Sequence, residues 1–159
     1  MWKRVYFDEF FGDFWPSLDQ LRPYFLLPPG QRWFFDSGND GAVLSAGTGE
    51  YTGDPVARRA QDKVDFYING HPTHGVLLFY RRWDGRHQKQ QGFYSRGDLT
   101  RLNEFVRTLH DDRLSVGLFI PFEQAWNAVK EFIETDGALP TSIAWIASRD
   151  LPPEVFPEP

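Results

Sequence analysis

The chain has 159 residues, no cysteine, an aromatic share of 17% and a formal charge of −5. Its length predicts one compact domain, and the missing cysteine excludes disulfides, thiolate-bound zinc, iron–sulfur clusters and a thiol nucleophile. A net negative chain lacks the basic surface that free nucleic acid requires, and its longest apolar run, Val76–Tyr80, is far shorter than a membrane span. We expect a cytoplasmic protein with no cofactor and with neither nucleic acid nor membrane as its direct partner.

A helix and a hairpin are predicted in the first third of the chain. Residues 17–25 carry apolar side chains at helical spacing after Pro16, and a Pro-Pro-Gly sequence follows them. Arg32–Asp36 and Ala42–Ala46 are expected to be the strands of a hairpin, because the five residues between them favour turns. Residues 47–59 show neither strand nor helix periodicity, and we expect a long exposed loop there.

The middle of the chain gives the clearest strand signal. Three extended segments separated by turn residues are predicted to be strands: Val64–Ile68, Gly75–Trp83 and Gln88–Ser95. Asn69-Gly70 and Asp84-Gly85 separate them, and both dipeptides are typical of tight hairpin turns. The basic side chains at residues 81–89 are therefore expected at a solvated hairpin tip.

The last third predicts further helices and strands. Apolar spacing favours a helix over residues 98–110, and alternating residues favour a strand over 114–120. Pro121–Glu134 is the strongest helix prediction, because one face is apolar and the other polar. A strand is expected at Ser142–Ile146, and the proline-rich residues after Ser148 are expected to be extended or disordered.

These elements predict an α+β fold. It comprises a mostly antiparallel sheet of about five to seven strands, one main C-terminal helix packed on the sheet, and one or two shorter helices. The domain is expected to span residues 1–150, and a Pro-rich tail is expected at residues 151–159.

One short sequence has residues suited to catalysis. His71 and His74 lie on a predicted turn, where two imidazoles can meet a metal ion. Asp62 or Asp65 could complete such a site in a metal-dependent hydrolase. No cysteine and no third nearby histidine supports this, so a plain turn is the simpler interpretation and no metal site is assigned. Because no serine elbow or tuned carboxylate pair is visible either, no catalytic residue and no enzyme is predicted.

The end of the chain is similar to one known protein family. Residues 120–137 read IPFEQAWNAVKEFIETDG, and Leu139-Pro140-Thr141 and Ile143-Ala144-Trp145 follow. This order of strand, Pro-x-Glu-x-Ala helix, threonine turn, proline and strand ending in tryptophan covers residues 114–147. It resembles the closing unit of the first-numbered immunity-protein family (Imm family 1) of bacterial polymorphic-toxin systems.

The resemblance implies a small α+β protein without catalysis that protects its producer by binding a cognate toxin domain. Such toxins are exported into rival bacteria in interbacterial competition, type VI secretion included, and they comprise nucleic-acid deaminases and nucleases. Occlusion of the toxin's active site is the implied mechanism. Two alternatives stay open, namely an interaction module for an endogenous partner and the metal-dependent hydrolase.

Candidate partner-binding residues are polar and aromatic side chains in the predicted loops, because aromatic residues at such positions often anchor protein interfaces. They are Asn39, Asp40, Glu50, Tyr51 and Asp54 in the first loops, and Trp83 and Asp84 at the hairpin tip.

Overall fold

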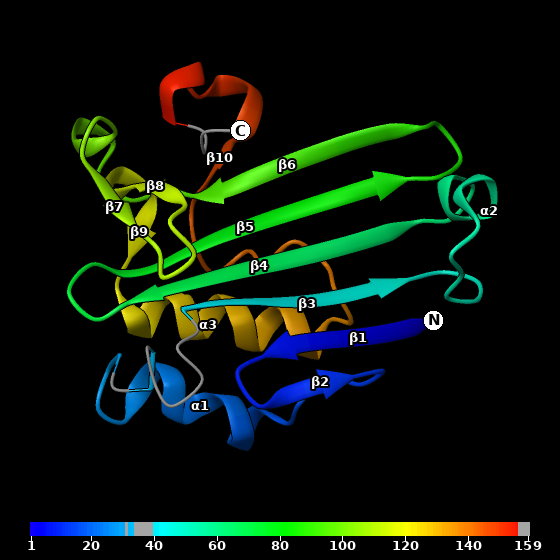
Figure 1. Cartoon of the computed structure of the whole chain (residues 1–159), viewed down its shortest axis with the longest axis horizontal. Coiled ribbons are helices and arrows are strands. Elements are labelled where there is room, and N and C mark those ends of the chain that lie inside the picture. Colours follow the sequence, from blue (N-terminus) through cyan, green and yellow to red (C-terminus); the bar gives the residue numbers. More distant parts are fainter. Residues whose placement is uncertain (31, 34–39, 156–159) are drawn as a thin grey trace.

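The computed structural model describes residues 1–30, 32, 33 and 40–155. Its main feature is a large antiparallel β-sheet (Figure 1). The strands of the main sheet are β1 (Trp2–Phe7), β2 (Phe10–Gly12), β3 (Gly41–Gly47), β4 (Lys63–His71), β5 (Gly75–Asp84), β6 (Lys89–Ser95), β9 (Phe119–Ile120) and β10 (Trp145–Ala147). In the described part of the chain these eight are ordered β10-β6-β5-β4-β3-β1-β2, with β9 paired to β5. A separate hairpin joins β7 (Phe105–Arg107) to β8 (Arg113–Ser115).

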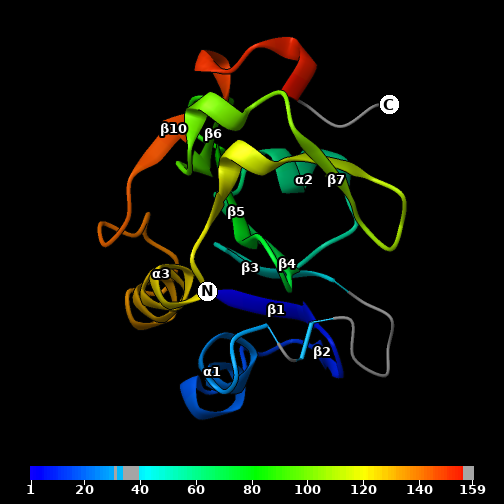
Figure 2. The same cartoon turned by 90° about the vertical axis from the view of Figure 1, so that its left-hand side faces the viewer.

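Two of the α-helices in the described residues cover one face of this sheet. The α-helices of the described residues are α1 (Leu18–Leu26), α2 (Pro55–Arg59) and α3 (Phe122–Glu134), and 3-10 turns occur at Leu99–Arg101, Val116–Leu118, Ser148–Asp150 and Pro153–Val155. Figure 2 shows α1 and α3 on one side of the sheet and the β7–β8 hairpin on the other. None of the helices in these residue ranges is long and apolar enough to cross a membrane.

Each side of the sheet carries an apolar cluster, and the cluster on the helix side is the larger of the two. Successive strand residues point to opposite faces, so Phe66 of β4 faces the helices, where its ring lies 4.4 Å from that of Phe132. The larger cluster joins α1, α3 and this face. The smaller one packs Leu77 of β5 against Phe119, Leu151 and neighbouring residues. Because the smaller cluster is centred on β5, β6 and β9, it does not cover the same face of β1, β3 and part of β4 in the described residues.

The predicted fold class is confirmed, and so are both helices that flank the sheet and the strands of its centre. The strand predicted at Arg32–Asp36 lies mostly outside the described residues. β1 and β2 were not predicted, because their aromatic and charged residues follow no clear period. β1 nevertheless pairs with β3 along its whole length.

Several local predictions were wrong, and tertiary contacts explain them. Asn69 and Gly70 continue β4, where both pair with β5, and the missing side chain of Gly70 leaves room for the ring of Trp33. Part of the predicted loop is α2, where Asp54 accepts a hydrogen bond from the Val56 amide at 3.1 Å. The last predicted strand begins only at Trp145.

The segment from residue 98 to 120 differs most from its prediction. A 3-10 turn and β7 replace the expected helix, and β8, a 3-10 turn and β9 replace the expected single strand. Two hydrogen bonds hold this arrangement, from the Val116 amide to the Glu104 carbonyl at 2.7 Å and from Ser115 Oγ to the Leu102 carbonyl at 2.8 Å. The apolar residues therefore contact the smaller cluster instead of forming a helical stripe.

The residues after Ser148 were expected to be extended or disordered, but residues 148–155 form two 3-10 turns. Leu151 and Val155 are buried there in the smaller apolar cluster. Their burial gives this segment the apolar contacts that its proline content alone did not suggest.

Replacing Phe132 by alanine should lower the free energy of unfolding by about 3–5 kcal/mol, because its fully buried ring joins α3 to the sheet. Gln124→Ala on the exposed side of the same helix is the control and should stay within about 0.5 kcal/mol of the wild type. Urea unfolding measures both. Equal unfolding midpoints for the two variants would contradict the packing described.

Candidate functional site

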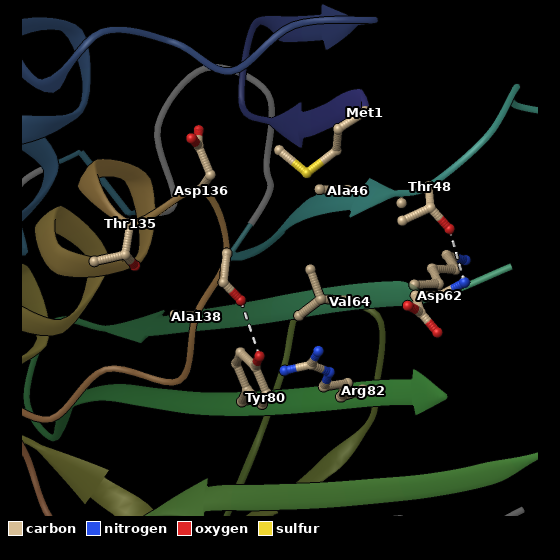
Figure 3. Close-up of a pocket in the computed structure, with 13 residues that line it drawn as sticks. Met1, Ala46, Thr48, Asp62, Val64, Tyr80, Arg82, Thr135, Asp136 and Ala138 are labelled. Atoms are coloured by element: carbon tan, nitrogen blue, oxygen red, sulfur yellow. Dashed lines mark hydrogen bonds between the residues drawn. The ribbon is translucent and has the colours of Figure 1, made fainter. Parts of the chain in front are cut away.

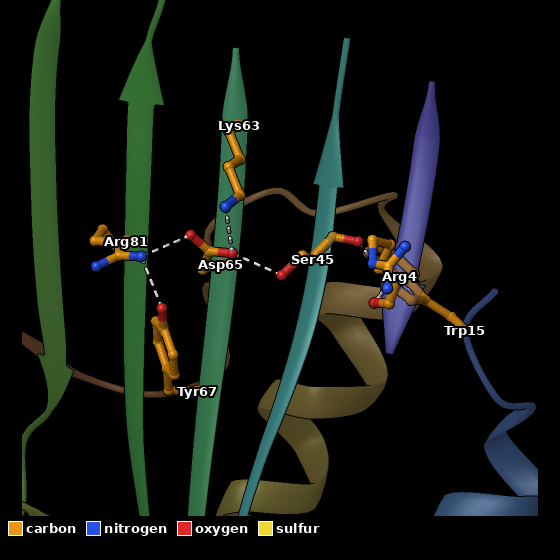
Figure 4. A network of polar contacts seen from close by, with 7 residues as sticks. All are labelled: Arg4, Trp15, Ser45, Lys63, Asp65, Tyr67 and Arg81. Carbon is orange, nitrogen blue, oxygen red and sulfur yellow. Dashed lines mark hydrogen bonds and ion pairs between the residues drawn. The ribbon is translucent and has the colours of Figure 1, made fainter. Parts of the chain in front are cut away.

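Part of the sheet surface opposite α1 and α3 is accessible, and we call it the open face. Its residues are the alternate strand positions that point away from the helices, together with Tyr51 beside them: Trp2, Arg4, Tyr6, Phe11, Ser45, Tyr51, Lys63, Asp65, Tyr67, Arg81 and Trp83. Figure 4 shows the centre of this face with α3 behind the strands. Most of these side chains are therefore mounted on paired strands, not on loops.

A nearly buried carboxylate organises the centre of the open face. Asp65 is 5% exposed and accepts a hydrogen bond from Ser45 Oγ at 2.6 Å. On its other oxygen it accepts one from Arg81 Nη2 at 3.0 Å, and Lys63 Nζ lies 3.5 Å from its Oδ1 (Figure 4). Arg81 Nη2 also donates to the Tyr67 hydroxyl at 2.7 Å. One carboxylate thus holds side chains from three adjacent strands.

The protonation states of this network follow from its surroundings. Burial raises the pKa of Tyr67, and the negative charge of Asp65 raises it further, so the phenol stays neutral. Burial alone would lower the pKa of Arg81, but its hydrogen bond to Asp65 and the nearby charges outweigh that effect and raise it. Arg81 is therefore a permanent cation on this surface.

A groove of about 430 Å³ lies where β4 and β5 meet α2, and we call it the basic groove. It is lined by Pro55, Arg58, Arg59, Lys63, Asp65, Arg81, Trp83 and Gln90. These residues include four cations and one carboxylate, a balance of +3. Trp83 Nε1 donates to the Arg59 carbonyl at 3.0 Å and so holds α2 against β5 as one wall of the groove.

Aromatic side chains form the other half of the open face. This aromatic patch consists of Trp2, Arg4, Tyr6, Phe11 and Tyr51, around a hollow of about 220 Å³ that shares Lys63 with the basic groove. The guanidinium of Arg4 lies 4.6 Å from the ring centre of Tyr51. Phe11 and Tyr51 are 68% and 56% exposed. Exposed groups of this kind are typical of protein interfaces.

A second hollow of about 280 Å³ lies on the helix side of the sheet (Figure 3). Its two carboxylates already have partners in the fold, because Asp62 accepts a hydrogen bond from the Gly85 amide at 2.9 Å and Asp136 pairs with Lys3 at 2.7 Å. The Tyr80 hydroxyl at its floor donates to the Gly137 carbonyl at 2.9 Å and so serves the packing of the chain after α3. The carboxylates and the tyrosine hydroxyl of this hollow are therefore used within the fold.

Five of the predicted binding residues meet at one end of the sheet, where α2 lies beside the β5–β6 turn (Figure 1). Tyr51 belongs to the aromatic patch and Trp83 to the basic groove, and Glu50 is exposed. Asp54 caps α2. Asp84 accepts hydrogen bonds from the backbone amides of the β5–β6 turn, so its carboxylate stabilises that turn.

The other two predicted residues do not join this group. Asp40 stands at the opposite end of β3, where it is 3% exposed and accepts a hydrogen bond from the Leu109 amide at 3.0 Å. Asn39 lies outside the described residues. Sequence reasoning also missed Arg4, Lys63 and Arg81, although Lys63, Asp65 and Tyr67 alternate with apolar residues in the pattern of a polar sheet face.

His71 and His74 contact each other, but neither contacts Asp65, one of the two aspartates of the possible metal site. Their ring centres are 4.7 Å apart, and His71 Nδ1 accepts hydrogen bonds from the Thr73 and His74 amides. Burial lowers the pKa of His71, and His74 lowers it further, which suits a neutral acceptor that closes a turn. Asp65 is about 20 Å away along β4. In residues 1–30, 32, 33 and 40–155, no three metal-binding groups cluster.

Asp65→Asn should lower the free energy of unfolding by about 1–3 kcal/mol, because it leaves Arg81 and Lys63 without their shared counter-charge. The matched control is Asp13→Asn, since the carboxylate of Asp13 also pairs with an arginine but is 78% exposed. The control should change stability by less than about 0.5 kcal/mol. Equal losses for the two variants in urea unfolding would refute the role given to Asp65.

Comparison with known proteins gives one match. The model of the family described as immunity protein Imm1 matches residues 36–147. This range holds β3 to β10, α2 and α3, and with them the whole basic groove, whereas β1, β2 and α1 precede it. Neither the curated proteins nor the solved structures contain a match to the chain.

Proposed function

The chain belongs to the Imm1 family of immunity proteins, and we propose that it neutralises a cognate bacterial toxin by binding over the toxin's active site. The toxin is a nucleic-acid deaminase or nuclease delivered in interbacterial competition, for example by type VI secretion. Binding takes place in the cytoplasm of the producing cell. The protein acts by occupying a surface and not by catalysis.

The observation that carries this proposal is the aromatic patch. Side chains such as Phe11 and Tyr51 are costly to leave in water, and tyrosine, tryptophan and arginine are the residues most often found at the energetic centre of interfaces. A standard interface takes about 800 Å² from each partner. That is about a tenth of the 8858 Å² surface of this chain.

The way the open face is built also favours tight binding. Its aromatic and charged side chains stand on paired strands, and Asp65 restrains two of the cations. Side chains that are already ordered lose less conformational entropy on association. A toxin inhibitor gains from this property, because it must compete with the toxin's own substrate.

Tyr51→Ala and Phe11→Ala should each weaken binding of the toxin domain encoded beside this protein by roughly 30-fold, about 2 kcal/mol. Each removes an exposed ring of the aromatic patch without opening the core. Leu27→Ala is the control, because Leu27 is also exposed, at 65%, but follows α1 on the helix side. Isothermal titration calorimetry measures the affinities.

Co-expression with the toxin provides the cellular measurement. The wild-type protein should restore growth, and the complex should survive size-exclusion chromatography at about micromolar concentration. Absence of both the complex and the rescue would refute the proposed function. A complex that Leu27→Ala weakens as much as Tyr51→Ala does would place the interface elsewhere.

A further inference from the structure

The basic groove has a charge opposite to that of the chain around it. The whole chain carries −5, yet four cations and one carboxylate line this groove. Lys63 and Arg81 share Asp65 as their counter-charge. Arg58 and Arg59 make no salt bridge with a carboxylate in the described ranges. The groove therefore keeps positive charge that its own residues do not neutralise.

The geometry of the groove points to a small anionic group. Within the described part of the chain, Arg81 donates hydrogen bonds to Asp65 and Tyr67, both from Nη2, so Nη1 and Nε keep donor capacity for a ligand. Guanidinium groups bind carboxylates with two parallel hydrogen bonds, which fixes the direction of approach. The groove volume of about 430 Å³ suits one or two side chains and not a folded element.

We propose that the basic groove receives an acidic segment of the cognate toxin, with a carboxylate placed between Arg58, Lys63 and Arg81. This inference rests on the proposed function and adds the chemistry of the contact. The aromatic patch supplies apolar contact area beside the groove, and Lys63 borders both. Opposite charges in the groove then fix the orientation of the toxin on the open face and speed its association.

The surroundings of the groove favour a protein segment over a nucleic acid. Glu50, Asp54 and Asp84 lie at the same end of the sheet, and Glu50 and Asp54 are exposed. Arg86 of the β5–β6 turn and Lys89 at the start of β6 lie there as well, so this end of the sheet carries both signs of charge. The small groove therefore suits a protein segment, which presents only a few negative groups locally, better than a phosphate chain. The net charge of −5 also repels a polyanion at long range.

The double variant Arg58→Glu/Arg59→Glu tests this contact on the full-length protein. Both side chains are exposed, so charge reversal should leave the fold intact, with only a small drop in the thermal midpoint because the two arginines lie in the last turn of α2. At about 50 mM NaCl the variant should bind the toxin domain at least about tenfold more weakly than the wild type, and the difference should shrink at about 300 mM. Arg22→Glu, an exposed arginine of α1, is the matched control and should bind as the wild type does.

A charge-reversal scan of the toxin's own aspartates and glutamates completes the experiment. One such toxin variant should restore binding to Arg58→Glu/Arg59→Glu, because the two reversed charges then attract each other. Unchanged or tighter binding of the double variant to the unmodified toxin would overturn the inference while leaving the proposed function intact. Binding of short single-stranded DNA or RNA that depends on Arg58 and Arg59 would overturn it as well. A wild-type protein that binds no toxin would instead refute the proposed function itself.

Discussion

The open face depends on the ion pairs and the hydrogen bond of one carboxylate. Asp65 is removed from water, which is unfavourable for an ionised group unless partners replace its hydration. Ser45 on β3, Lys63 on β4 and Arg81 on β5 replace it. Without Asp65 the two cations would repel each other and move apart. The carboxylate therefore holds the polar side chains of the three central strands in place and sets the direction in which the two cations point.

The same strands serve stability on one side and recognition on the other. In β4, Val64, Phe66 and Ile68 are buried against the helices, while the residues between them reach the open face. A shift in pairing by one residue would exchange the two sets, so the packing of α3 also protects the recognition surface. The match to the Imm1 family covers this central part of the sheet, whereas β1, which carries Arg4 and Tyr6, lies before the matched residues.

Local sequence patterns were sufficient to predict a helix or strand where the contacts that stabilise it are also local in the sequence. The apolar stripe of α3 and the strands around Asp84-Gly85 were predicted correctly for this reason, and the resemblance at the end of the chain led to the right family. The structure of residues 98–120 was not predicted correctly, because contacts with residues far away in the sequence determine it. Tyr51 and Trp83, which were predicted to bind the partner as aromatics next to loops, lie on the open face. Lys63 and Arg81 were not among the predicted binding residues, and Asp65 was considered only as a metal ligand. No local pattern tells which face of a strand the helices leave uncovered, and Asp40 resembles an exposed turn residue until the fold buries it.

The central claim is that the open face, and not the helix side, contacts the toxin. Hydroxyl-radical footprinting of the protein alone and in its complex with the toxin domain tests this claim directly, because exposed aromatic side chains are readily labelled. Phe11 and Tyr51 should lose most of their labelling in the complex, while Leu27 should keep its own. Unchanged labelling of Phe11 and Tyr51 together with protection of Leu27 would contradict the account.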